Sequence, residues 1–138
     1  MIPTWRRAHL ALLAGALMTG CSLACHLTEF DTWSAADHIV IRLGHQRPDR
    51  TITDRLRIAQ IAAFAQAHAD GWRRPWYGTP VGDITLDVYR GPRFMGHLAI
   101  GSSFLESQGC DDFMSRSVSP TDRRVILSLV GLPEDNAK

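Results

Sequence analysis

The chain has 138 residues, of which 45% are hydrophobic, and a formal net charge of +1. A chain of this size can bury the core of one domain, so we expect a single domain rather than several. The near-neutral charge gives no electrostatic basis for binding nucleic acid, and nucleic acid is therefore not an expected partner.

The first 20 residues have the composition of a secretory signal. Arg6 and Arg7 precede an apolar run, from about Ala8 to Met18, that is rich in Leu and Ala. A transmembrane helix needs roughly 20 apolar residues to cross the hydrocarbon core, and this run is about half as long. The run is therefore predicted to be the apolar part of a signal peptide rather than a membrane span.

The residues that end this segment, Thr19, Gly20 and Cys21, resemble the lipobox of bacterial lipoproteins, with Met18 where Leu is usual. The resemblance covers residues 1–25. It implies that the Cys21 thiol is acylated and that a signal peptide over residues 1–20 is removed.

Cys25 is a second candidate for the acylated position. Ser22 stands where an aliphatic residue is usual before such a cysteine, so Cys21 is preferred. A further alternative is an ordinary cleavable signal in which neither cysteine is acylated.

The resemblance also implies a location, which is the bacterial cell envelope, with the mature chain attached to a membrane by acyl chains. Ser22, rather than Asp, follows Cys21. In Gram-negative lipoproteins, a residue other than Asp after the acylated cysteine implies sorting to the outer membrane, facing the periplasm.

Cys25 and Cys110 are the cysteines that remain if Cys21 is acylated. In an oxidising compartment they either form one disulfide or stay apart, with Cys25 in a linker and Cys110 as a small buried residue. A disulfide closing so long a loop would stabilise the fold by about 4 kcal/mol in the chain-entropy description.

The mature chain is predicted to consist of a tether over residues 21–36, one domain over 37–132 and a C-terminal tail over 133–138. The β-branched run near Ile39 predicts a strand over 38–43, and residues 44–50 are turn-like. Apolar residues at three- and four-residue steps predict a helix over 51–70, with Thr53 as its N-cap.

The next segments alternate between apolar and polar residues, over 83–89 and again over 94–100. The turn sequence Arg90-Gly91-Pro92 lies between them, so 83–101 is predicted to be a hairpin. Phe104 and Leu105 are expected in a packed connection, and residues 113–118 in a short edge strand.

Ser119 is predicted to begin a second helix, because Pro120 suits the first helical position and Gly131 ends the apolar pattern. The element order is then β-α-β-β-(β)-α. It predicts an α+β fold in which a small antiparallel sheet of three to four strands packs one face against two helices.

The most unusual segment is the loop from Gly71 to Pro80, which contains two Trp, one Tyr and two Arg. These residue types dominate interface hot spots, and loops often carry function. We interpret the aromatic and basic residues of this loop as a binding surface for an envelope protein, a glycan or lipid headgroups. The alternative is that the Trp rings fold back to complete a thin core. The residues of the predicted surface are Trp72, Arg73, Arg74, Trp76 and Tyr77.

The chain contains no motif for catalysis, metal binding or cofactor binding. H-E-x-x-H, C-x-x-C, the P-loop, G-x-S-x-G and the dinucleotide fingerprint are all absent from the sequence. We therefore expect no catalytic residue, no metal and no cofactor.

The preferred interpretation is a membrane-anchored envelope lipoprotein that acts as a binding module. A small envelope hydrolase is an alternative, for which His97 would have to meet Cys110 or Asp111. A structural subunit of an envelope complex is another, and it would dock through an exposed sheet edge.

Overall fold

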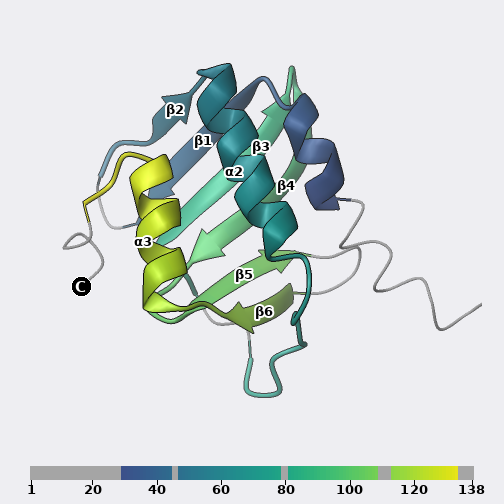
Figure 1. The fold of residues 1–138 in the computed structure, drawn as a ribbon, viewed down its shortest axis with the longest axis vertical. Coiled ribbons are helices and arrows are strands. Elements are labelled where there is room, and N and C mark those ends of the chain that lie inside the picture. The colour runs from purple at the N-terminus through teal and green to yellow at the C-terminus, as the bar shows by residue number, and fades with distance from the viewer. Residues whose placement is uncertain (1–28, 45–46, 79–80, 109–112, 134–138) are drawn as a thin grey trace, which may run out of the picture.

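The computed structural model describes residues 29–44, 47–78, 81–108 and 113–133. These residues form a six-stranded antiparallel sheet with helices on one face (Figure 1). The predicted α+β class and the placement of helices on one face are confirmed. The predicted number of three to four strands is wrong.

The strands lie in the order β2-β1-β3-β4-β5-β6 across the sheet. Only the step from β2 to β3 is not a direct connection between neighbouring strands, and it contains helix α2. The bounds are β1 (His38–Leu43), β2 (Arg50–Ile52), β3 (Ile84–Arg90), β4 (Arg93–Ile100), β5 (Phe104–Gln108) and β6 (Phe113–Ser117).

The sequence analysis did not identify β2 and β5. Strand β2 has only three residues, and its pairing with β1 places Ile52 opposite Ile39 at the margin of the core. Strand β5 contains the polar residues Glu106 and Ser107 in its buried part, so it lacks the apolar alternation of a half-buried strand. Both pairings depend on neighbours that local sequence does not reveal.

Two helices cover one face of the sheet, α2 (Arg55–Ala67) and α3 (Pro120–Leu129). Helix α2 is shorter than predicted because β2 takes the residues before it. Its N-cap is Asp54, whose carboxylate accepts a hydrogen bond from the Arg57 amide at 2.7 Å, rather than Thr53. Helix α3 begins as predicted, with the Ser119 hydroxyl accepting from the Asp122 amide at 3.0 Å.

A third helical segment over residues 29–35, which ends in the 3-10 turn η2 (Trp33–Ala35), packs on the same face (Figure 1). Phe30 and Trp33 of this segment are fully buried, and their rings meet edge to face with centroids 4.9 Å apart. The packed domain therefore begins before residue 37, within the range that was predicted to be tether.

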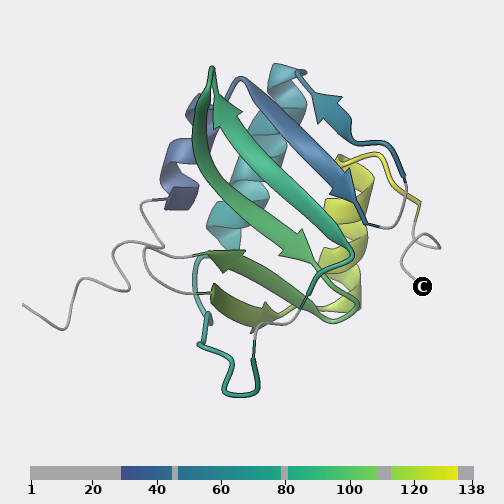
Figure 2. The same ribbon diagram turned by 180° about the vertical axis from the view of Figure 1, so that it is seen from behind.

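The core lies between the sheet and the helices. Alternate residues of the central strands face it, including Ile41, Leu86 and Leu98, and Ile61 and Ile126 meet them from the helices. No helix of the described ranges lies across the opposite face of the sheet (Figure 2). The residues that alternate with the core positions, such as Arg42, Asp87 and His97, belong to that helix-free face.

Candidate binding site

The loop over residues 71–78 leaves the end of α2 and extends beyond the sheet below β6 (Figure 1). Its first part is fixed to the outer edge of β6. The Arg73 amide donates to the Ser115 carbonyl at 2.8 Å, and the Ser115 amide donates to the Arg73 carbonyl at 2.9 Å. This bridge occupies the middle of an edge that would otherwise be open.

Arg116 provides a second attachment for the loop, from the other face of β6. Its guanidinium donates to the carbonyl of His68 at 2.8 Å and to that of Asp70 at 2.7 Å. These carbonyls follow the end of α2, where cationic side chains are favourable. The side chain thus ties β6 to the segment from which the loop starts.

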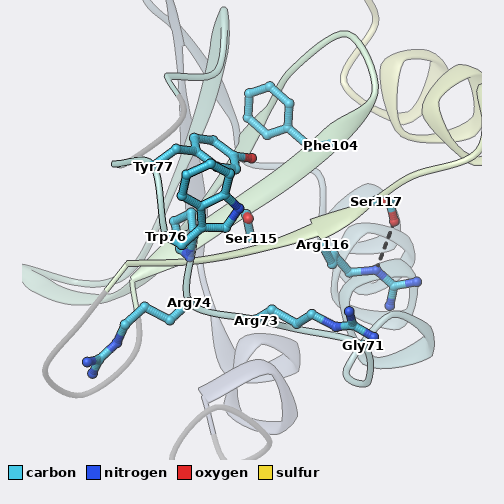
Figure 3. A pocket seen from close by; sticks show the side chains of 10 residues that line it. Gly71, Arg73, Arg74, Trp76, Tyr77, Phe104, Ser115, Arg116 and Ser117 are labelled. Atoms are coloured by element: carbon cyan, nitrogen blue, oxygen red, sulfur yellow. Dashed lines mark hydrogen bonds between the residues drawn. The ribbon is translucent and has the colours of Figure 1, made fainter.

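Between the loop and strands β5 and β6 lies a pocket of about 560 Å³ (Figure 3). The loop contributes aromatic and basic side chains to it, and the strands contribute one aromatic ring and two hydroxyls. The main lining residues are Arg73, Arg74, Trp76 and Tyr77 from the loop, and Phe104, Ser115 and Ser117 from the strands.

Trp76 and Tyr77 are the exposed aromatic side chains of the loop, 92% and 66% exposed. Their rings meet edge to face with centroids 5.5 Å apart. In Figure 3 they lie beside Ser115 and below Phe104, on the side of the loop that faces β5 and β6. Both side chains are therefore largely accessible to solvent beside the pocket.

The wall opposite these rings is made by Phe104. Its ring lies against Gly101, where a Cβ atom would come within 2.3 Å of it. The approach requires glycine at this position, because any side chain there would displace the ring. Gly101 thus fixes one boundary of the pocket.

Trp72 lies apart from the other four residues of the predicted surface. Its ring packs partly buried against the core, 5.7 Å between centroids from Phe30, and its indole N–H donates to the His68 carbonyl at 2.8 Å. Trp72 therefore follows the alternative interpretation of this loop, in which a Trp ring folds back onto the core. The exposed surface consists of Arg73, Arg74, Trp76 and Tyr77.

The two loop arginines extend in different directions. Figure 3 shows Arg73 extending along β6 in the direction of Arg116, whereas Arg74 extends to the opposite side. The Arg73 guanidinium makes no hydrogen bond or ion pair within the described part of the chain, although that of Arg116 is engaged with backbone carbonyls. Among the described residues, Arg73 is thus a cation beside the pocket whose guanidinium has no partner.

A second polar cluster lies on the helix-free face, at the middle of the sheet. His97 Nε2 lies 3.2 Å from a carboxylate oxygen of the buried Glu106, and this hydrogen bond raises the pKa of His97. The neighbouring Asp87 carboxylate accepts from the Arg42 guanidinium at 2.5 Å. Because each of these polar groups has a hydrogen-bond partner within the sheet, we interpret the cluster as structural. Glu106 was not predicted as a site residue, because it belongs to no recognisable motif.

The other predicted site residues fall outside the described residues. These are Cys21, Cys25, Cys110 and Asp111, so neither the acylation site, the disulfide nor a meeting with His97 is described. Within the described ranges, no group of three His, Cys, Asp or Glu side chains is placed to hold a metal ion. No helix in those ranges has the length and apolarity to cross a membrane.

Comparison of the chain with protein families, with curated proteins and with solved structures finds no match.

Proposed function

We propose that the chain is a membrane-anchored envelope lipoprotein whose domain binds a ligand in the pocket between loop 71–78 and strands β5 and β6. The observation that carries this proposal is Trp76. Its side chain is 92% exposed at the mouth of a pocket, in a loop that two separate contacts hold in place. An exposed Trp at a fixed position is characteristic of a binding hot spot.

The pocket supports binding rather than catalysis. Among the residues that the structure describes, its lining contains cationic, aromatic and hydroxyl groups and no Asp, Glu, His or Cys side chain. General acid–base chemistry needs a group that exchanges protons near neutral pH, and arginine remains charged there. The lining is suited to holding an anionic or ring-shaped ligand.

The proposed anchor at Cys21 would place this pocket in the cell envelope. Arg6 and Arg7, the short apolar run and the small residues before Cys21 support an acylated N-terminus. A pocket on an anchored domain meets its ligand at the high local concentration of the envelope, so modest affinity is sufficient.

A comparison of two exposed apolar residues tests the function. We expect Trp76→Ala in the mature lipidated protein, held in detergent micelles, to reduce retention on isolated cell-envelope material at least tenfold. Leu56→Ala is the matched control, because Leu56 is 69% exposed on α2 and does not line the pocket. It should leave retention unchanged.

Thermal unfolding distinguishes loss of binding from loss of the fold. Trp76 is absent from the core cluster, so Trp76→Ala should change the free energy of unfolding by less than about 0.5 kcal/mol. Unchanged retention by this variant, or clear destabilisation of the domain, would contradict the proposed function.

A further inference from the structure

We propose that the pocket recognises an acidic glycan, with a sugar ring against Trp76 and Tyr77 and a sugar-borne carboxylate on Arg73. This inference rests on the proposed function and specifies its ligand class. The supporting features are the charge of the lining, the placement of the rings and the Arg73 guanidinium, which has no partner among the described residues.

The charge of the pocket selects for an anion. Of the ten described residues that line it, three are arginines and none is Asp or Glu. Arg116 is committed to the carbonyls after α2, and Arg74 extends away from Arg73 in Figure 3. Arg73 therefore supplies the guanidinium fork that can hold a carboxylate with two parallel hydrogen bonds.

The aromatic rings select for a second feature of the ligand. One face of a pyranose ring presents C–H groups, which pack against the electron-rich face of an aromatic ring. Trp76 and Tyr77 meet at an interplanar angle of 89°, so they offer two faces in different orientations. Such a pair can seat a sugar ring while leaving its equatorial hydroxyls free for hydrogen bonds.

The strands provide partners for those hydroxyls. Ser115 and Ser117 line the floor of the pocket, and both belong to the same face of β6 as shown by their pairing with Glu106 and Phe104 of β5. A volume of about 560 Å³ lies within the range of small-ligand sites.

The same observations favour a glycan over a lipid surface. A loop that inserts among lipids presents its apolar side chains outward, where they reach the acyl chains. Here Trp76 and Tyr77 line a pocket whose lining also includes two serines and three arginines, and Ser115 lies beside the two rings (Figure 3). A polar hollow beside the rings is suited to a hydroxyl-rich ligand.

Two disaccharides that differ by one acidic substituent test the inference. The acidic probe is N-acetylglucosamine β-1,4-linked to N-acetylmuramic acid. The neutral probe is diacetylchitobiose, which has a hydroxyl in place of the 3-O-lactyl group and therefore lacks its carboxylate. Binding to the mature lipidated protein in micelles is measured by calorimetry. We expect the acidic disaccharide to bind at least tenfold more tightly, and Trp76→Ala, but not Leu56→Ala, to weaken both.

A pair of arginine variants assigns the carboxylate contact. Arg73→Ala should remove the preference for the acidic probe and leave the affinity for the neutral probe unchanged. Arg93→Ala removes the same charge from the β3–β4 turn, away from the pocket, and should behave as wild type. Equal affinity of wild type for both probes, or a preference that survives Arg73→Ala, would overturn the inference.

The outcomes separate the glycan from the broader function. If neither probe binds while Trp76→Ala still abolishes envelope retention, the glycan is wrong and the binding module stands. If Trp76→Ala changes nothing in either assay, both proposals fail. A lipid-binding loop would give a different result. Tryptophan emission would shift to the blue with vesicles that contain phosphatidylglycerol but not with phosphatidylcholine vesicles, the shift would be lost in Trp76→Ala, and neither disaccharide would bind.

Discussion

At the scale of single residues, Glu29 of the N-terminal helical segment lies against Gly96 of the sheet. Gly96 lies beside the irregularity in the β3–β4 pairing and has a φ of +142°. The Glu29 carboxyl occupies the space where a Cβ of residue 96 would be, since that atom would come within 1.7 Å of it. Glycine is therefore required both by the backbone and by the neighbour.

This placement makes the stability of the domain depend on pH. Burial raises the pKa of Glu29 from its ordinary value of 4.5 to about 7, although the charge of His97 opposes the shift. Between about pH 4.5 and pH 7, the folded chain thus holds more protons than the unfolded chain, and the free energy of unfolding falls as the pH rises. The raised pKa of His97 acts in the same direction, because its stabilising hydrogen bond to Glu106 is lost as that pKa is passed.

We expect chemical denaturation of the wild type to give a lower free energy of unfolding at pH 8 than at pH 5. Glu29→Gln should reduce this difference by about 1–2 kcal/mol, less than the full linkage value because the carboxyl is partly exposed. Asp31→Asn, an exposed acid of the same helical segment, is the control and should retain the wild-type pH dependence. The same dependence in Glu29→Gln would show that burial of this carboxyl does not control it.

The two tryptophans of the loop show what the sequence alone can predict about single residues. Trp72 and Trp76 are four residues apart in the same unusual segment, and composition marked both as candidates. Only one is anchored, because Phe30 and the His68 carbonyl are within reach of Trp72. Those partners come from other elements, so no local pattern distinguishes the two rings.

At the scale of elements, the binding loop depends on the junction between α2 and β6. The Arg116 guanidinium donates to two carbonyls that follow α2, and the Arg73–Ser115 bridge continues the attachment along β6. Both contacts join residues more than 40 positions apart in the chain, as the bond from Arg116 to His68 shows with its separation of 48. The pocket is therefore a product of tertiary pairing.

We expect Arg116→Ala to release the loop without unfolding the sheet. The variant removes the Arg116 donor from the carbonyls of His68 and Asp70, although the His68 carbonyl keeps the Trp72 indole N–H, and this loss should lower the free energy of unfolding by about 1–3 kcal/mol. Hydrogen exchange should accelerate at the Arg73 and Ser115 amides, whose bonds form the bridge. Arg93→Ala should change neither quantity, and unaltered exchange at both amides in Arg116→Ala would remove Arg116 from the support of the loop.

Elements with strong local signals were predicted well. The hairpin of β3 and β4 follows an apolar alternation, and α3 has a cap at Ser119 with proline after it. Strand β2 and the early helical segment were missed because they are short and are stabilised by what they pack against. The exposed residues of the loop were identified by composition, whereas the strand half of the pocket was not. Phe104, Ser115 and Ser117 carry no motif and become relevant only when β6 lies beside the loop.

At the scale of the whole molecule, the first described helical segment is part of the core. Phe30 and Trp33 are buried, and Gln66 of α2 donates to the Phe30 carbonyl at 3.3 Å. If the chain is acylated at Cys21, only seven residues, 22–28, separate the anchor from this segment. A fully extended chain spans at most about 3.6 Å per residue, so the anchor would hold the domain within roughly 30 Å of the membrane surface.

The intact mass of the protein extracted from native membranes without reductant tests this arrangement. We expect the mass of residues 21–138 plus acyl groups, and a further loss of two hydrogens if Cys25 and Cys110 are joined. Cys21→Ser should abolish acylation, whereas Cys25→Ser should retain it and remove any two-hydrogen difference. An unacylated wild-type mass would contradict the anchor. Acylation that survives Cys21→Ser but not Cys25→Ser would move the anchor to Cys25. Only three residues, 26–28, would then lie between the anchor and the helical segment, so the domain would be held closer to the membrane.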